Sequence, residues 1–255
     1  MPEATFRFYQ ELNDFLPPER RKIQFMHHFR DRASVKDMIE RFGVPHTEID
    51  LILVNGQSVD FSYIIQDKDY ISVYPMFESI DITPLLKCRP QPLRETRFVL
   101  DVHLGKLAIY LRLMGFDAVY RNDFSDETLA EISVAEKRIL LTRDRGLLKR
   151  KAITHGCFIR ATQPKRQLKE VLLRFDLVHN LSPLKRCLRC NHLLSPVAKS
   201  SIVHKIPPRV QKYYDEFYRC TGCGQIYWKG THWTNMQRFI EEITGAKASI
   251  PASEK

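Results

Sequence analysis

The sequence predicts a multi-domain α/β protein built from three successive segments, and three observations support this. Residues 5–77 contain short strand-like runs and one helical pattern in the order ββαββ. From residue 97 onward, apolar runs alternate with helical patterns, which is typical of βαβ units and a mainly parallel sheet. Two Cys-x-x-Cys pairs then follow. A length of 255 residues suits one to three domains with real hydrophobic cores.

Basic residues are concentrated in the later two thirds of the chain. Residues 1–86 contain 9 Lys and Arg against 14 Asp and Glu, whereas residues 87–255 contain 31 against 16. This asymmetry indicates an acidic accessory module joined to a part that binds a polyanion, and nucleic acid is the commonest such partner. A solvated basic surface is the alternative interpretation.

The sequence predicts a cytoplasmic protein that does not contact a membrane. No apolar run approaches the roughly 20 residues of a membrane span, and the N-terminus lacks the basic start and apolar core of a signal peptide. In a reducing compartment, six cysteines are not expected to form disulfides. Cys88 and Cys157 are isolated in the sequence, and we expect them to be ordinary thiols.

The N-terminal segment shows local signals for each of its elements. Two strands precede a helix that starts after Ser34 and ends at Gly43, and an apolar strand then turns at Asn55-Gly56 before a last strand at 69–76. This order, with "VNG" and the closing "DKDYISVYP", resembles the ubiquitin-like β-grasp modules of the sulfur-carrier type. Those carriers act through a free C-terminal Gly-Gly. Here the chain continues, so the resemblance does not imply a carrier function.

A proline-containing stretch at 81–96 separates this module from a second pattern. The second pattern predicts strands at 97–102, 116–121, 139–144 and 157–161, and helices at 104–115, 125–138 and 164–176. We therefore predict a β-grasp domain at 1–80, a linker at 81–96, an α/β domain at 97–180, a zinc module with a C-terminal helix at 181–245 and a tail at 246–255.

Aspartates follow the predicted strands of the α/β domain. Asp101 ends the first strand, Asp144 ends the third, and Asp126 opens the helix after the second. Because the carboxyl ends of parallel strands meet at one sheet edge, we expect these side chains to converge. Clustered carboxylates favour Mg²⁺ or Mn²⁺, ions that activate water in phosphodiester cleavage. Taken singly, each aspartate also suits a cap, a turn or a strand end.

Basic side chains flank the predicted acidic site. Arg143 and Arg145 lie on either side of Asp144 and are candidate phosphate contacts. Lys106 lies one helical turn from Asp101 and is a third candidate substrate contact. For Arg112, on the same predicted helix, we expect a solvated position instead.

The segment "RFVLDVHLGKLAIYLRLMGFDAVYRNDFSDETLAEISVAEKRILLTRDRGLL" resembles the Mut7-C ribonuclease family, a branch of the PIN-like nucleases. The similarity runs through the cysteine pairs to "YWKGTHW" and covers roughly residues 97–240. It implies a PIN-like catalytic domain with Asp101, Asp126 and Asp144 at the family's acidic positions. For a fourth acid, Asp123 and Glu127 are both candidates. Bacterial members often carry a ubiquitin-like N-terminal domain, which agrees with the first segment.

The four paired cysteines predict a structural zinc site. Cys187 and Cys190 form one pair, Cys220 and Cys223 the other, and 29 residues separate the pairs. Each pair can make a tight knuckle, and four thiolates saturate a tetrahedral ion without leaving a position open for catalysis. Gly222 and Gly224 suit the second knuckle, whose amides must face sulfur. A redox Cys-x-x-Cys is the alternative.

Aromatic and basic residues alternate around the second cysteine pair. Lys205, Arg209, Lys212 and Arg219 mix with Tyr213, Tyr214, Tyr218, Trp228 and Trp233. Such a mixture suits single-stranded RNA, through phosphate attraction and base stacking. The same aromatic residues could instead form the small core of a zinc module, and the sequence leaves both interpretations open.

The function predicted from these features is a metal-dependent ribonuclease that cleaves RNA phosphodiester bonds with a carboxylate-bound Mg²⁺ or Mn²⁺ ion. The alternative is a non-catalytic RNA-binding or ribosome-associated adaptor with a vestigial acidic site. A third and more distant alternative is a sulfur-transfer partner, which would need the carrier tail that the sequence lacks. The acidic N-terminal module is a candidate docking surface for another protein.

Overall fold

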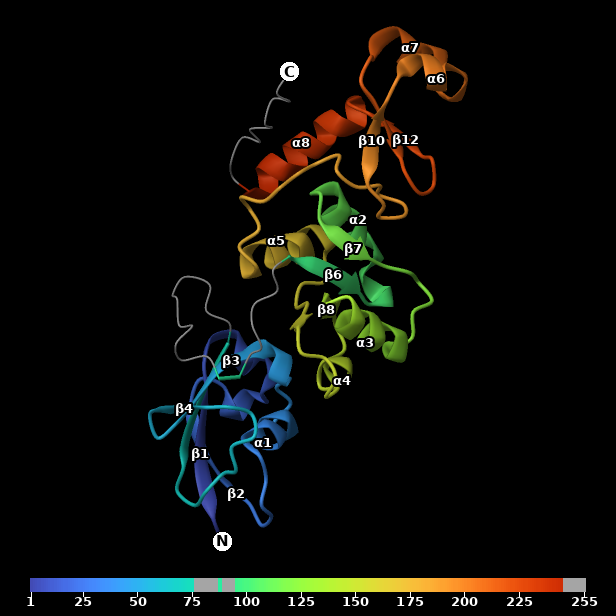
Figure 1. The fold of residues 1–255 in the computed structure, drawn as a ribbon. Helices are drawn as coiled ribbons and strands as arrows, with labels where there is room; N and C mark the ends of the chain where they lie inside the picture. The colour runs from blue at the N-terminus through green and yellow to red at the C-terminus, as the bar shows by residue number, and fades with distance from the viewer. Residues whose placement is uncertain (76–86, 89–94, 245–255) are drawn as a thin grey trace. The chain divides into compact units, whose positions relative to one another are not determined.

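The computed structural model describes residues 1–75, 87–88 and 95–244 (Figure 1). The contacts among these residues divide them into two compact units. The first unit comprises Met1–His103 and Tyr120–Arg160, and the second comprises Leu104–Val119 and the described residues from Ala161 onward. The predicted linker at 81–96 lies mostly outside the described residues, and the predicted tail at 246–255 lies wholly outside them. The predicted domain boundaries stay predictions. None of the helices in the described ranges is long and apolar enough to cross a bilayer.

The N-terminal part of the first unit is a five-stranded sheet in the order β2-β1-β5-β3-β4. Its strands are β1 (Glu3–Phe8), β2 (Gln24–His28), β3 (Ile49–Val54), β4 (Gln57–Val59) and β5 (Tyr70–Pro75). β1 and β5 pair in parallel, and the other neighbours pair antiparallel. This mixed sheet confirms the predicted β-grasp module.

Local sequence signals set the boundaries of these elements. Helix α1 (Val35–Arg41) begins where the Ser34 hydroxyl accepts the Asp37 N–H at 3.1 Å, as a capping residue does. The turn between β3 and β4 is formed by Asn55 and Gly56, whose φ angles of 50° and 83° lie in the left-handed region that these residue types adopt readily. The sequence did not predict the 3₁₀ helices η1 (Gln10–Phe15), η2 (Pro18–Arg20) and η3 (His46–Glu48).

The core of this module follows from the alternation along β1. Phe6 and Phe8 point inward and pack with buried residues of α1 such as Met38 and Ile39. Cys88 is buried in the same core, so it is the ordinary thiol that the sequence predicted.

Three parallel strands carry the α/β part of the first unit: β6 (Arg97–Leu100), β8 (Ile139–Thr142) and β9 (Gly156–Phe158). Leu100 pairs with Leu141, and Thr142 pairs with Phe158. Their apolar side chains are almost all buried, as expected of parallel strands covered on both faces. Helix α3 (Asp126–Ala135) precedes β8, and the short helix α4 (Arg145–Leu148), which the sequence did not predict, follows it.

The second unit combines helices with a three-stranded antiparallel sheet in the order β10-β11-β12. The 3₁₀ turn η5 (Val102–Leu104) leads into α2 (Gly105–Leu113), which buries Leu107, Ala108 and Leu111, and β7 (Asp117–Val119) follows. The remaining elements are α5 (Pro164–Arg174), β10 (Leu194–Val197), α6 (Lys199–Ile202), η6 (Val203–Lys205), α7 (Pro208–Tyr213), β11 (Phe217–Cys220), β12 (Ile226–Trp228) and α8 (Thr231–Thr244).

Within the first unit, a buried carboxylate joins the β-grasp module to the α/β strands. Glu48 is fully buried, accepts the Phe158 N–H at 2.7 Å and pairs with Arg160 at 3.1 Å. The Phe15 ring packs edge-on against Phe158, and the Arg160 guanidinium lies over the same Phe15 ring. A buried charge needs such partners, because its desolvation is otherwise uncompensated.

We expect Glu48→Gln to lower the free energy of unfolding by about 2–4 kcal/mol, because it leaves the partly buried Arg160 without its buried partner. Urea unfolding of the full chain measures this loss. Asp14→Asn is the matched control, since Asp14 pairs with the same arginine but is 61% exposed, and it should cost less than about 1 kcal/mol. Equal losses in the two variants would contradict the role of Glu48.

Candidate active site and cysteine cluster

A buried hydroxyl links two of the predicted acidic residues. Thr142 is fully buried at the end of β8, and its Oγ1 donates to Oδ2 of Asp101. The same oxygen accepts the Asp144 N–H at 2.9 Å. The second carboxylate oxygen of Asp101 accepts the Val102 N–H at 2.6 Å. The two aspartates are therefore held at neighbouring strand ends, and Asp101 itself is buried.

Asp144 combines a capping role with an exposed carboxylate. Its Oδ1 accepts the Gly146 N–H at 2.6 Å and the Leu147 N–H at 3.4 Å, so Asp144 is the N-cap of α4. The alternative interpretation of Asp144 was a turn residue, and the structure gives Oδ1 a local role of another kind, as a helix cap. Because the side chain is exposed, it also remains accessible to an ion or a substrate.

Asp126 is not needed as a cap. Ser125 caps α3, since its hydroxyl accepts the Thr128 N–H at 3.2 Å. The Asp126 carboxylate, about half exposed, instead lies 3.7 Å from the Arg150 guanidinium. Arg150 also pairs with Glu127 at 2.8 Å. A cation therefore stands among acidic side chains of α3.

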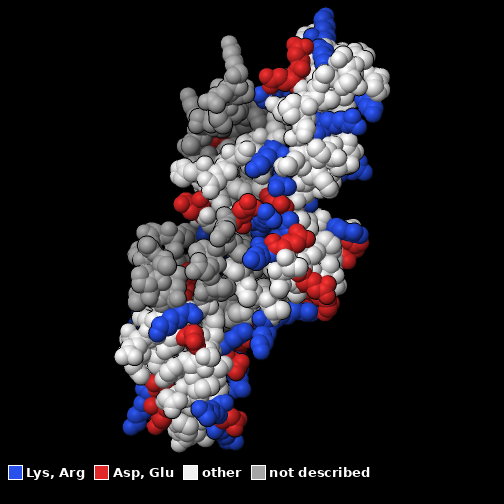
Figure 2. Space-filling view, in the orientation of Figure 1, with Lys and Arg blue, Asp and Glu red and all other residues white. Residues whose placement is uncertain are grey.

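Asp144 also interacts electrostatically with Arg150. The hydrogen bond from Arg150 to Glu127 raises the pKa of Arg150, and the negative charges of Asp126 and Asp144 act in the same direction. The same hydrogen bond lowers the pKa of Glu127. Figure 2 shows acidic and basic side chains interleaved over α3 and α4. The sequence analysis did not select Arg150, although it ends the basic stretch after Asp144.

The remaining acidic candidate has a partner of its own. Asp123 forms a two-bond ion pair with Arg121, at 2.9 and 2.7 Å, and this pairing lowers the pKa of Asp123. Both side chains are exposed. Among the described residues, the side chains gathered closely enough to hold a metal ion are the four paired cysteines, and Asp101, Asp126 and Asp144 do not form a second group of this kind. The predicted convergence of the three aspartates is therefore looser than a preformed ion site.

The predicted substrate contacts occupy different positions. Arg143 donates to the carbonyls of Ile159 and Arg160 at 3.3 and 3.1 Å, which holds the chain after β9. Arg145 lies over the Phe15 ring and donates to the Phe15 carbonyl at 3.3 Å. Lys106 is exposed on α2, in the second unit. The two arginines thus already have partners within the protein.

The four cysteines form a compact cluster at the end of β11, whose last residue is Cys220. Their sulfur atoms all lie within 4.8 Å of one another, with Cys187 3.6 Å from Cys223 and Cys190 3.3 Å from Cys220. Four thiolates about 2.3 Å from a tetrahedral zinc ion are spaced about 3.8 Å apart, so the cluster fits that ion closely. The predicted set of ligands is confirmed as a site that can hold a metal such as zinc.

Backbone amides of the second knuckle face sulfur. The N–H groups of Gly222 and Cys223 point at the Cys220 Sγ at 3.3 and 3.4 Å, whereas the Gly224 N–H bonds to the Cys220 carbonyl. Burial alone would raise the pKa of Cys220, but these N–H groups, together with the Cys190 and Cys223 thiols, lower it to about 6. Stabilisation of the thiolate prepares this residue to bind a cation.

A buried arginine supports the first knuckle, and the expectation of a solvated Arg112 was wrong. Arg112 is 4% exposed and donates to the carbonyls of Leu188 and Arg189 at 3.0 and 3.1 Å, and to Ala118 at 2.9 Å. Burial lowers the pKa of this guanidinium. Helix α2 thus holds the loop between Cys187 and Cys190.

A ubiquitin-like module, a parallel α/β part with aspartates at its strand ends and a four-cysteine cluster consistent with a zinc ribbon together define a multi-domain α/β protein. The model of the Mut7-C RNase domain matches residues 96–240, more than half of the chain, and the model of the Mut7-C ubiquitin domain matches residues 1–81. The chain belongs to the Mut7-C RNase family. Comparisons with curated proteins and with solved structures give no match.

We expect the purified full chain to bind about one zinc ion, since four thiolates saturate a tetrahedral site. Cys220→Ser should lose most of this zinc, as measured by atomic absorption after gel filtration. Cys88→Ser is the control, because Cys88 lies in the core of the N-terminal module and should retain zinc. Full zinc content in Cys220→Ser would contradict the assignment.

Proposed function

We propose that this protein is a metal-dependent ribonuclease in which Asp101, Asp126 and Asp144 hold a catalytic Mg²⁺ or Mn²⁺ ion. Membership of the Mut7-C RNase family supports the nuclease class. The single observation that carries the metal assignment is the position of the Arg150 guanidinium. This cation lies 3.7 Å from the Asp126 carboxylate, and the negative charge of Asp144 also raises its pKa. Carboxylates that already attract the positive charge of Arg150 provide the negative charge that a divalent ion also needs.

The three aspartates differ in mobility, which suits different tasks at one site. Asp101 is fixed by two hydrogen bonds, so its carboxylate provides a rigid anchor. Asp144 is fixed through Oδ1 only, and Asp126 is restrained by its weak pairing with Arg150. Carboxylate oxygens are the ligands that Mg²⁺ and Mn²⁺ prefer. When bound, such an ion would activate a water molecule and stabilise the leaving oxygen of the phosphodiester.

Arg150 is the cation that we place nearest to the RNA phosphate. Its contacts are exposed carboxylates, so it can exchange Asp126 for a phosphate at little cost. The guanidinium N–H groups of Arg143 and Arg145 already donate to backbone carbonyls, so these residues would have to share those donors with a phosphate. We keep them, with Lys106, as proposed substrate contacts. Asp123 and Glu127 remain the candidates for a fourth acid.

The zinc ion proposed for the cysteine cluster has a structural role. All four thiols are used as ligands, which leaves no open position for a substrate or water. Cys220 is the last residue of β11 and Cys223 follows it, whereas Cys187 and Cys190 precede β10. The ion would therefore join the end of β11 to the loop before β10. We propose that this module helps to hold RNA.

Asp144→Asn should reduce cleavage of RNA at least about a hundredfold, because a metal ligand contributes several kcal/mol to stabilisation of the transition state. Asparagine is as good an N-cap as aspartate, so α4 should persist. The measurement is cleavage of labelled single-stranded and structured RNA with Mg²⁺ or Mn²⁺. EDTA should abolish it and added Mn²⁺ should restore it, with zinc content monitored in parallel.

Glu131→Gln is the matched control, since Glu131 is an exposed acid on α3 and should retain full activity. Full activity of Asp144→Asn, or cleavage that persists in EDTA, would remove the proposed mechanism. RNA binding without cleavage by the wild-type chain would favour the adaptor alternative.

Arg150→Gln should tighten Mn²⁺ binding about two- to fivefold, because it removes a positive charge beside the proposed ion and such exposed charges contribute up to about 1 kcal/mol. Isothermal titration calorimetry of the full chain measures this. Arg166→Gln, an exposed change on α5, should leave Mn²⁺ affinity unchanged. Weaker Mn²⁺ binding in Arg150→Gln would mean that this guanidinium does not compete for the carboxylates.

A further inference from the structure

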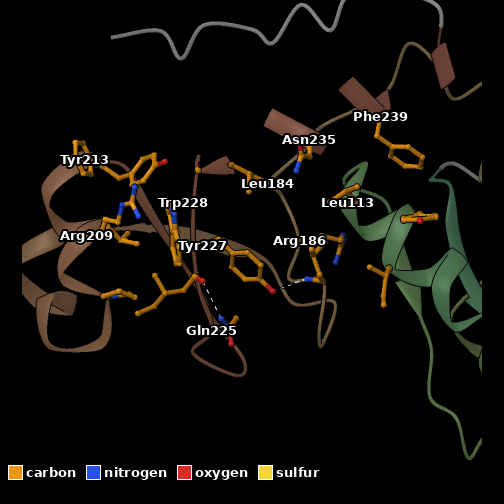
Figure 3. Close-up of a pocket in the computed structure, with 18 of the residues that line it drawn as sticks. Leu113, Leu184, Arg186, Arg209, Tyr213, Gln225, Tyr227, Trp228, Asn235 and Phe239 are labelled. Carbon is orange, nitrogen blue, oxygen red and sulfur yellow. Dashed lines mark hydrogen bonds between the residues drawn. The ribbon is translucent and has the colours of Figure 1, made fainter. Parts of the chain in front are cut away.

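The second unit contains a groove lined by aromatic side chains that the proposed chemistry does not use. Its volume is about 1300 Å³, larger than the range of about 300–1000 Å³ typical of small-molecule pockets. Figure 3 shows its side chains running from Tyr213 and Arg209 at one end, past Trp228 and Tyr227, to Leu113 and Phe239 at the other. We call this the aromatic groove. Its size and extension suit a segment of a polymer.

The structure separates the aromatic residues into core and surface. Tyr214 and Trp228 pack against the small core of Ile202, Ile206 and Phe217, so for them the core interpretation is correct. Tyr213 is different, because it is 64% exposed although it is a large aromatic residue. Its ring is therefore accessible to a ligand, and the Lys212 ammonium lies 5.7 Å from its centroid.

The other end of the groove presents a second aromatic platform. The rings of Tyr110 on α2 and Phe239 on α8 lie 4.9 Å apart, centroid to centroid, and both line the groove. Lys165 also lines the groove, 4.9 Å from the Phe239 centroid, and its ammonium pairs with Glu242 at 3.0 Å. Because both side chains of this pair are more than half exposed, Lys165 can exchange Glu242 for a phosphate. A ring beside a cation is the arrangement that binds a base and its phosphate together.

The charge around the groove favours a polyanion. Residues 181–230 contain nine Lys and Arg but two Asp and Glu, and both acids are paired, Asp215 with Lys199 and Glu216 with Lys229. Figure 2 shows separate patches of Lys and Arg over β10–β12 and the helices α6 and α7. Arg209 lines the groove itself and is exposed. An apolar peptide would match the rings but not this charge.

We propose that the aromatic groove binds unpaired RNA, with bases stacked on Tyr213 and on the Tyr110–Phe239 pair and phosphates near Arg209 and Lys165. This inference rests on the proposed ribonuclease function for its choice of RNA. Stacking requires free base faces, which a duplex does not offer, so the groove selects single-stranded segments. The groove does not discriminate strongly among sequences, because every base has a face that can stack.

The test is binding of a fluorescein-labelled oligouridylate of about twelve nucleotides, a length within the usual site size, measured by fluorescence anisotropy. The full chain carries Asp144→Asn so that the RNA stays intact. Adding Tyr213→Ala should weaken binding about five- to thirtyfold, whereas Tyr213→Phe, which keeps the ring, should bind normally. Arg209→Gln should reduce the salt dependence of log Kd by about 0.7.

The control is Tyr70→Ala, an exposed tyrosine of β5 outside the groove, which should not change RNA affinity. Zinc content and thermal unfolding should be the same in all groove variants, since Tyr213 is largely exposed. Unchanged RNA affinity in Tyr213→Ala would overturn the proposal and leave the groove to an apolar partner. Equal affinity for a duplex of the same length would also overturn it, because only phosphate contacts would then remain.

Cleavage by the wild-type chain is measured separately. If it is absent while Tyr213→Ala still weakens binding, the ribonuclease assignment fails and the groove stands. If cleavage is present while Tyr213→Ala binds normally, the groove fails and the ribonuclease stands.

Discussion

The buried hydroxyl of Thr142 is the contact on which the proposed active site depends. Parallel pairing of β6 and β8 brings the end of one strand beside the end of the other, and the Thr142 oxygen then bridges them by donating to Asp101 and accepting from the Asp144 backbone. Because the hydroxyl is fully buried, neither bond can be replaced by water. Thr142 thus fixes the carboxylate of Asp101 and the backbone of Asp144, whereas the Asp144 carboxylate is oriented by the first amides of α4. Such support from regular elements is what precise catalytic positioning requires.

Much of the fold could be predicted because its signals are local. Each signal depends on residues that are only a few positions apart in the sequence. Examples are the capping serine before α1, the Asn55-Gly56 turn and the buried apolar runs of β6 and β8. Arg112 shows where this fails, because its partners at Leu188 and Arg189 lie 76 and 77 residues away and no helical pattern reveals them. Arg150 was missed for a related reason. A basic run after Asp144 is typical of a solvated surface, and only the fold brings its last residue to the acids of α3.

The N-terminal module is coupled to the strand that carries the proposed chemistry. Arg145, the first residue of α4, stacks on Phe15 of the module, and Lys149 donates to the Glu40 carbonyl at 2.7 Å. His46 contacts the carbonyl of Ile153 at 2.9 Å, and Glu48 binds β9. These contacts surround the segment that begins at Asp144. A ubiquitin-like domain used in this way supports its own chain, which differs from the role of a carrier that presents a free tail.

The two proposed metal sites differ in how completely the protein builds them. The thiols are soft ligands, already gathered within 4.8 Å, so they favour zinc and can hold it permanently. The aspartates are hard ligands that stay more open and are partly neutralised by Arg150. Mg²⁺ is usually held by one or two carboxylates together with substrate phosphate oxygens. On the proposed assignment, the open acidic site would bind its ion tightly only when phosphate oxygens of RNA complete the ligand set.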